Sequence, residues 1–149
     1  MFDALLEGIV NLGSIHSLLL LAAGSCVGVL FGAIPGLGGT TAVALLIPLT
    51  FGMEPWQAII LMGGVMAATS TGGSVSAILL NTPGIAPNAA TTFDGYPLAQ
   101  QGKAGMAIGA AATASAMGGV IGVISLVAVI PIMKAIVLLF TPPEFFMLA

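Results

Sequence analysis

Two glycine-rich runs, Gly36–Thr41 and Gly72–Ser74, carry the residues best suited to hold a negatively charged solute. In each run paired glycines and hydroxyl residues open a short apolar segment, which is typical of a helix N-terminus. Free N–H groups and the helix dipole favour an anion there, and the hydroxyl groups either cap those amides or leave them to a carboxylate. The candidate substrate-binding residues in these runs are Gly36, Gly38, Gly39, Thr40, Thr41, Gly72, Gly73 and Ser74.

Polar residues after the second run could complete such a site. Asn81 both donates and accepts hydrogen bonds, and Thr82 supplies a hydroxyl beside Pro83, whose missing N–H leaves a nearby carbonyl unpaired. We therefore add Asn81 and Thr82 to the substrate-binding candidates. Asp94 is the only acidic residue in the polar stretch 85–102 and is the candidate for a coupling cation. Asp94-Gly95 is also a dipeptide that is common in turns, and we favour a turn over a cation site at Asp94.

These residues suit binding better than catalysis. The single histidine, His16, has no convincing serine partner for a hydrolase, and no lysine follows Gly-Leu-Gly-Gly-Thr-Thr as a phosphate-binding loop requires. The lone Cys26 lies in an apolar run and is interpreted as a small packing residue, not as a redox centre or metal ligand. We therefore predict no enzyme activity, no catalytic residue, no bound metal and no cofactor other than a coupling cation.

The composition places these residues in a lipid bilayer. Hydrophobic residues make up 58% of the chain and charged residues 5%, with a mean hydropathy of +1.19, whereas soluble domains carry roughly 25% charged residues. The only basic residues are Lys103 and Lys134, which excludes a nucleic-acid surface. They lie on either side of one span and so give no membrane orientation. The sequence predicts an all-α polytopic membrane protein.

Glycine and proline divide the apolar sequence into segments. The first span is expected from Ser14 to Ile34, near the ~20 residues that a bilayer needs, with Gly24 and Gly28 on a face that another helix can approach closely. The segment from Thr40 to Phe51 is too short to span, so we expect a re-entrant half-helix. Further helical pieces are expected at residues 56–70, 75–80 and 104–130, with breaks at 72–74, at 81–84 and at Pro131.

The break around Pro35 interrupts a stretch without charge from Gly8 to Met53. In hydrocarbon each unpaired backbone polar group costs several kcal/mol, so a broken helix is tolerated only where it is buried in protein or lines a wet cavity. Secondary transporters build their substrate sites from such helices near the bilayer midplane. The break therefore predicts a transporter.

Residues 2–12 are expected to form an interfacial amphipathic helix. Their apolar side chains recur at helical spacing, with Asp3 and Glu7 on other faces. The alternative is that they extend the first span. A secretory signal is excluded because acidic residues stand where a basic start is required.

Three runs resemble the large permease subunit of tripartite tricarboxylate transporters, the TctA family. They are Gly32–Gly39, Gly72–Gly84 with its Asn-Thr-Pro-Gly, and Ala90–Ala99 with its Asp-Gly-Tyr-Pro, in this order and spacing. The resemblance implies a multi-pass subunit of the bacterial inner membrane that works with a small membrane subunit and a periplasmic solute-binding protein. It also implies uptake of citrate or a related di- or tricarboxylate, driven by a sodium or proton gradient.

Members of that family are considerably longer. Residues 1–149 are therefore expected to be a single, partial transmembrane domain, the N-terminal portion of such a permease. Alone they are expected not to transport, because a few apolar pieces cannot enclose a path without a counterpart repeat. The alternative function is a non-transporting membrane scaffold or assembly subunit, since glycine-rich spans suit helix packing.

Overall fold

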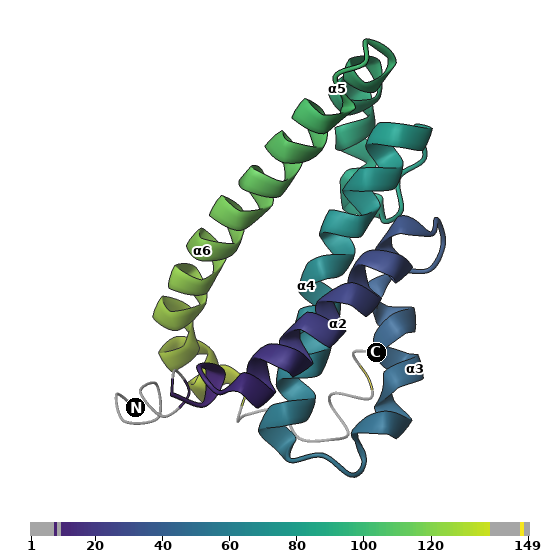
Figure 1. The fold of residues 1–149 in the computed structure, drawn as a ribbon. Coiled ribbons are helices and arrows are strands. Elements are labelled where there is room, and N and C mark those ends of the chain that lie inside the picture. The colour runs from purple at the N-terminus through teal and green to yellow at the C-terminus, as the bar shows by residue number, and fades with distance from the viewer. Residues whose placement is uncertain (1–7, 9, 138–146, 148–149) are drawn as a thin grey trace. The chain divides into compact units, whose positions relative to one another are not determined.

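A computed structural model describes residues 8, 10–137 and 147, and the part of the chain that it describes is helical without any strand. The elements in order are α2 (Ile15–Ala33), α3 (Gly39–Thr50), α4 (Pro55–Leu80), η1 (Ala86–Asn88), α5 (Ala89–Gln100) and α6 (Ala104–Val137) (Figure 1). Three helices, α2, α4 and the stretch Ala104–Pro131 of α6, are long and apolar enough to cross a membrane. The predicted all-α membrane fold is confirmed.

The chain divides into two compact units, Met1–Ala112 and Thr113–Ala149. The predicted interruption at Pro131 in the second unit is wrong, because α6 continues through this proline to Val137. A proline removes one helical hydrogen bond, and long apolar helices can carry that loss. The expected amphipathic helix at residues 2–12 lies largely outside the described residues, of which Gly8 and residues 10–12 are helical.

The two spanning helices of the first unit begin at well-defined caps. Ser14 is the N-cap of α2, and its side chain accepts a hydrogen bond from the N–H of Ser17 at 3.2 Å. Glu54 is the N-cap of α4 and forms a reciprocal capping box with Gln57, with Pro55 at the first helical position. The start predicted for the first span is therefore confirmed.

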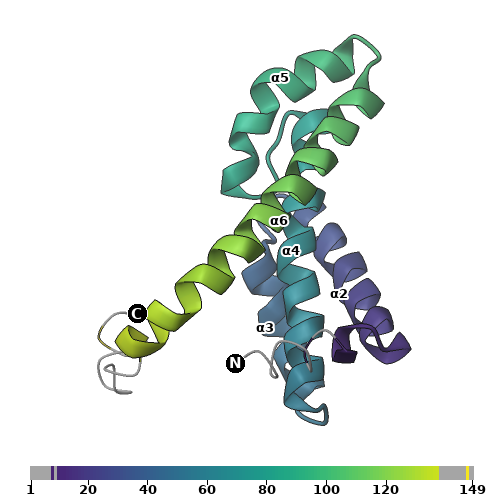
Figure 2. The same cartoon turned by 90° about the vertical axis from the view of Figure 1, so that its left-hand side faces the viewer.

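The helices α2 and α4 pack side by side and run in the same direction (Figures 1 and 2). Glycines make the contact: a methyl group added to Gly24, Gly28 or Gly32 would collide with carbonyl oxygens of α4. These oxygens belong to Leu61, Val65 and Thr69. Because both sets recur every fourth residue, the backbones touch along one continuous seam. The close-approach role predicted for Gly24 and Gly28 is confirmed.

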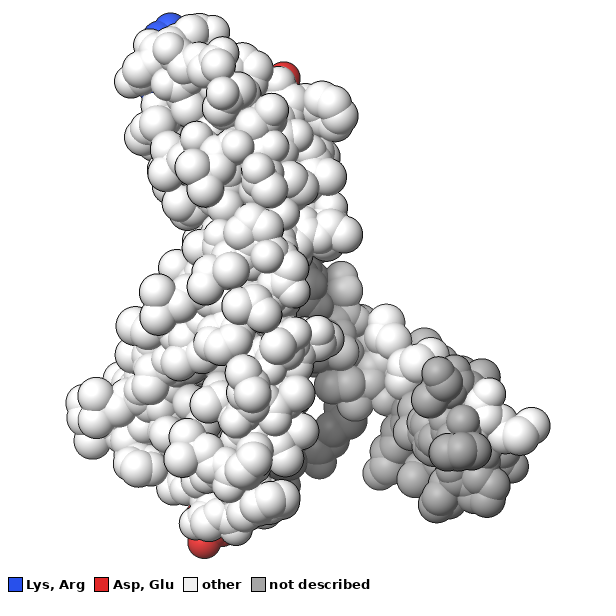
Figure 3. Space-filling view, turned by 90° about the vertical axis from the view of Figure 1, so that its right-hand side faces the viewer, with Lys and Arg blue, Asp and Glu red and all other residues white. Residues whose placement is uncertain are grey.

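The described charges of the first unit stand outside its long apolar helices. They are Glu54 before α4, Asp94 in α5 and Lys103 before α6. On the face shown in Figure 3, the coloured charged atoms of the described residues lie toward the top and the bottom, and the white surface between them carries no charge. Beside Glu54 the rings of Trp56 and His16 meet edge to face, with centroids 6.5 Å apart. An uncharged band bordered by charged and aromatic residues is typical of a bilayer-facing surface.

The short helix α3 turns back from the end of α2 and runs antiparallel to α4 (Figure 1). The first loop, residues 34–38, joins α2 to α3. Gly39 begins α3 and lies against α4, since a methyl group there would be 3.0 Å from the Oγ1 of Thr69. Pro48 lies inside α3 without ending it. The predicted short helix is confirmed, and its re-entrant course in the membrane stays a prediction.

The predicted break at residues 72–74 is wrong, because α4 is one uninterrupted helix. Both glycines allow close packing instead. A methyl group on Gly72 would collide with the carbonyl oxygen of Val29 in α2, and one on Gly73 with the side-chain amide of Asn88. Two interior glycines cost a helix about 2 kcal/mol relative to alanine. Packing of α4 against its neighbours offsets that cost.

The second loop, residues 81–85, follows α4 and confirms the predicted break there. The turn favoured at Asp94 is wrong, because Asp94 and Gly95 lie within α5. Gly95 is buried against α4, where an added methyl group would be 2.7 Å from the Cγ1 of Ile78, so this glycine serves helix packing. The chain turns instead at Gly102, where φ is 76°.

Candidate functional site

The two loops meet beside the middle of α4. Gly84 of the second loop donates its N–H to the carbonyl of Gly73 at 3.4 Å. A methyl group on Gly84 would collide with the carbonyl oxygen of Gly32 at the end of α2. The Cγ2 atom of Ile85 would lie 3.8 Å from a methyl group on Gly38 in the first loop. We call this meeting of the two loops, the start of α3 and the middle of α4 the loop junction.

The loop junction lies along the length of α4 and not at its ends. With a rise of 1.5 Å per residue, the contacts at Thr69 and Gly73 lie about 21 and 27 Å from Pro55, and Leu80 lies about 38 Å from it. The hydrocarbon core of a bilayer is about 30 Å thick. Irregular backbone at such a depth needs protein or water around it. We therefore take the loop junction as the candidate solute site.

At the loop junction α3 begins without a side-chain cap. Its N-cap residue is Gly38, whose carbonyl accepts the N–H of Ala42 at 3.2 Å. The capping role considered for Thr40 and Thr41 is absent, and Thr40 is exposed while Thr41 is half-buried. The dipole and first-turn N–H groups of α3 can therefore hold a carboxylate.

The predicted residues of α4 adjoin the loop junction in a different role. Gly72, Gly73 and Ser74 are buried in the interior of the helix. Their N–H groups belong to its hydrogen-bond ladder, so the helix N-terminus predicted at these residues is wrong. The hydroxyl of Ser74 donates to the carbonyl of Ser70 at 3.1 Å. Direct contact of these three residues with a substrate stays a prediction.

The remaining predicted residues follow the end of α4. Asn81 is the exposed C-cap of α4, with φ of 54°, a left-handed conformation that asparagine tolerates. Thr82 is exposed and its hydroxyl donates to the carbonyl of Leu80 at 3.2 Å. Both belong to the second loop. Asp94 is exposed on α5, and its role at a coupling cation stays a prediction.

Sequence reasoning missed the buried polar groups at the loop junction. Asn88 is 4% exposed, and its Nδ2 donates to the carbonyl of Ser70 at 2.8 Å. The hydroxyl of Ser76, 3% exposed, donates to the carbonyl of Gly73 at 3.1 Å. One sequence signal could have drawn attention to Asn88: asparagine is a common N-cap residue. Asn88 does stand before α5, but its side chain does not cap that helix.

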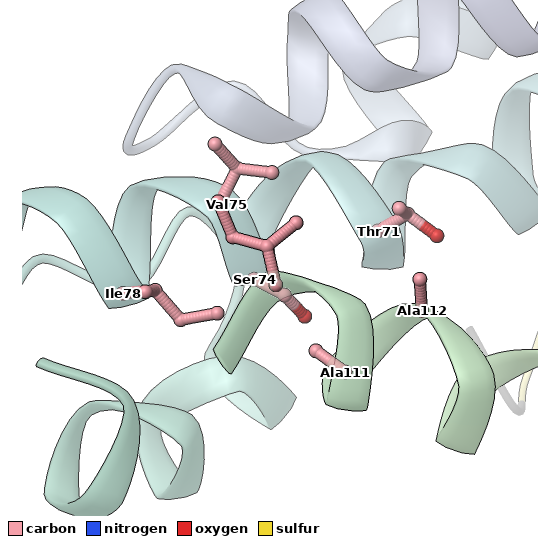
Figure 4. A pocket seen from close by; sticks show the side chains of 7 residues that line it. Thr71, Ser74, Val75, Ile78, Ala111 and Ala112 are labelled. Atoms are coloured by element: carbon pink, nitrogen blue, oxygen red, sulfur yellow. The ribbon is translucent and has the colours of Figure 1, made fainter. Parts of the chain in front are cut away.

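A small pocket lies beside the same stretch of α4, between this helix and α6. Its labelled lining residues are Thr71, Ser74, Val75, Ile78, Ala111 and Ala112 (Figure 4). A free volume of about 10 Å³ is no larger than one water molecule needs. The pocket is therefore too small for a carboxylate substrate.

The fold is that of an all-α membrane protein in which a loop interrupts the chain between α2 and the short helix α3, and interrupted helices are found in secondary transporters. The chain belongs to the tripartite tricarboxylate transporter TctA family, whose sequence profile matches residues 18–149. It is also 38% identical over 125 residues to a protein of Agrobacterium vitis described as "Uncharacterized 52.8 kDa protein in TAR-I ttuC' 3'region". That match covers 84% of this chain and 25% of the relative. No solved structure matches the chain.

Proposed function

We propose that this chain forms part of a permease through which citrate or a related di- or tricarboxylate enters a bacterium, coupled to a sodium or proton gradient. Membership of the TctA family supports a role in carboxylate transport. Because the match covers a quarter of the relative's length, the activity is proposed for a permease that contains this chain.

The loop junction could hold a multiply charged anion without arginine. The chain has two basic residues in all, so backbone N–H groups would carry most of the charge interaction. The first turn of α3, from Gly39 to Thr41, would bind one carboxylate, with the first loop and its Gly36 beside it. Asn81 and Thr82 would supply polar atoms from the second loop. The observation that carries this proposal is the uncapped start of α3 beside that loop.

The proposed partners and ion follow from the family. A small membrane subunit and a periplasmic solute-binding protein would complete the system in the inner membrane. Loop carbonyl and hydroxyl oxygens suit sodium, and Asp94 remains the proposed acidic ligand or proton carrier for coupling.

A substrate-mimicking substitution at Thr40 tests the site. Membrane vesicles would contain the permease with its two partners, and uptake of radiolabelled citrate would be measured with and without sodium and proton gradients. We expect gradient-dependent uptake in the wild type. Thr40→Asp should raise the citrate concentration for half-maximal uptake at least about tenfold, because its carboxylate occupies the dipole end and repels the substrate. Thr40→Asn, which is similar in size and uncharged, is the matched control.

Three outcomes would count against this proposal. Citrate uptake that ignores both gradients would overturn the coupling, and unchanged half-saturation in Thr40→Asp would overturn the site. A wild-type complex that assembles but takes up no di- or tricarboxylate would instead support the alternative of a scaffold or assembly subunit.

A further inference from the structure

We propose that Asn88 is a positioning residue that ties the second loop to α4 and thereby sets the geometry of the loop junction for substrate. This inference rests on the proposed function. Asn88 does not itself bind the substrate; it acts through the backbone of residues 84–88 and the side chain of Ile85.

The contacts of Asn88 bridge distant parts of the first unit. Its Nδ2 donates to the carbonyl of Ser70 at 2.8 Å, across 18 residues of sequence. The side chain is 4% exposed and covers Gly73, where an added methyl group would collide with Nδ2 and lie 3.3 Å from Cγ. The fit therefore depends on an amide at position 88 and on the absence of a side chain at position 73.

Two hydrogen bonds attach Gly84 of the second loop and Asn88 of η1 to α4 within the helix, away from its last residue. One runs from the N–H of Gly84 to the carbonyl of Gly73 and is 3.4 Å long. The other is the bond from Asn88 to Ser70, which at 2.8 Å has the more favourable length. Because Asn88 is 4% exposed, water has little access to replace this bond if it is lost. Asn88 thus supplies the stronger of the two attachments.

Ile85 lies between these two attachments and transmits their effect. Its Cγ1 would be 3.2 Å from a methyl group on Gly73, and its Cγ2 would be 3.8 Å from one on Gly38. Gly38 is the N-cap of α3. Releasing Asn88 would therefore shift Ile85 relative to the start of α3, where the carboxylate is proposed to bind.

A double-mutant cycle tests the contact itself. Gly73→Ala should impair citrate uptake strongly, because its methyl group displaces the amide of Asn88. Asn88→Ala should raise the citrate concentration for half-maximal uptake roughly two- to tenfold, the range expected for one lost hydrogen bond, with the maximal rate within about twofold of the wild type. The double variant should resemble Asn88→Ala alone, because the methyl group then fills the vacated space. If Gly73→Ala lowers citrate uptake by the same factor in the wild type and in the Asn88→Ala variant, the proposal is overturned.

Cross-linking measures the position of the loop without any transport. In a Cys26→Ser background, Gly38→Cys and Ile85→Cys should be joined by a short thiol cross-linker, and adding Asn88→Ala should lower the yield several-fold. Asn88→Asp keeps the shape but loses the Nδ2 donor, and should lower the yield as well if the alanine variant does not fold. Thr92→Val is the matched control, because the Thr92 hydroxyl bonds within α5 to the carbonyl of Ala89.

The two measurements separate the two proposals. A wild type without citrate uptake overturns the proposed function, and the cross-linking yield then decides whether Asn88 holds the loop. If the yield is unchanged in both Asn88 variants, or if it falls while half-saturation stays that of Thr92→Val, Asn88 is not a positioning residue for the site.

Discussion

Glycines in this protein act mainly as contact surfaces. Gly28 brings the backbone of α2 against the carbonyl of Val65, and Gly72 brings α4 against the carbonyl of Val29. The contacts are reciprocal, because each helix offers glycine where the other offers a carbonyl. Without a hydrophobic force between helices in lipid, such close van der Waals packing is a principal source of association.

Alanine at Gly28 should separate the two helices. Its methyl group would collide with the carbonyl oxygen of Val65 and lie 2.9 Å from the Cβ of Ala68. Overpacking of this kind costs about 1–3 kcal/mol, so the thermal unfolding midpoint in detergent should fall. Gly63→Ala is the control, since nothing lies within 4 Å of a methyl group there, and alanine favours a helix by up to about 1 kcal/mol. Equal midpoints for the two variants would contradict the packing.

The sequence predicted some of the helices and loops correctly and others wrongly. The first span, the short helix α3 and the breaks at residues 34–38 and 81–85 were all foreseen, because proline and glycine act on their own neighbours in the chain. The interruptions expected at residues 72–74 and Pro131 were wrong. Helix propensity is a weak guide wherever packing or the bilayer compensates for it.

The first loop depends on the backbone at Gly36. Its φ of 88° lies where side chains are strained, yet nothing lies within 4 Å of a methyl group there. Gly36→Ala should therefore cost about 1–2 kcal/mol of unfolding free energy through the backbone alone. Gly36→Asn should cost less, because asparagine tolerates left-handed conformations. Thermal unfolding of both variants checks this, and an alanine variant as stable as the wild type would refute it.

Within the first unit, α2 and α4 run in the same direction (Figure 1). The helix α3, which lies between them in the sequence, runs in the opposite direction. The start of α2 and the end of α3 therefore face the same side, whereas α5 follows the opposite end of α4. The loop between α2 and α3 follows the end of α2, and the second loop folds back from the end of α4. This arrangement brings both loops to the middle of α4.

Thiol labelling tests that arrangement. In a Cys26→Ser background, Asn11→Cys and Gly52→Cys should react with an impermeant maleimide from the same side of the membrane, and Gln101→Cys from the other. All three positions are exposed. Intact spheroplasts and inverted vesicles give the two sides. Labelling of the first two positions from opposite sides would contradict the return of α3 to the side on which α2 begins.

Composition and local punctuation were sufficient for the membrane class, the first span and the two broken loops, since these depend on what each segment exposes to lipid. They could not assign individual glycines or Asn88. A glycine permits both a break and a close approach, and the outcome depends on whether a distant backbone fills the space of its missing Cβ. Val29 fills that space at Gly72, Ile78 at Gly95 and Asn88 at Gly73. Those neighbours are set by packing between segments far apart in the chain, which no local pattern encodes.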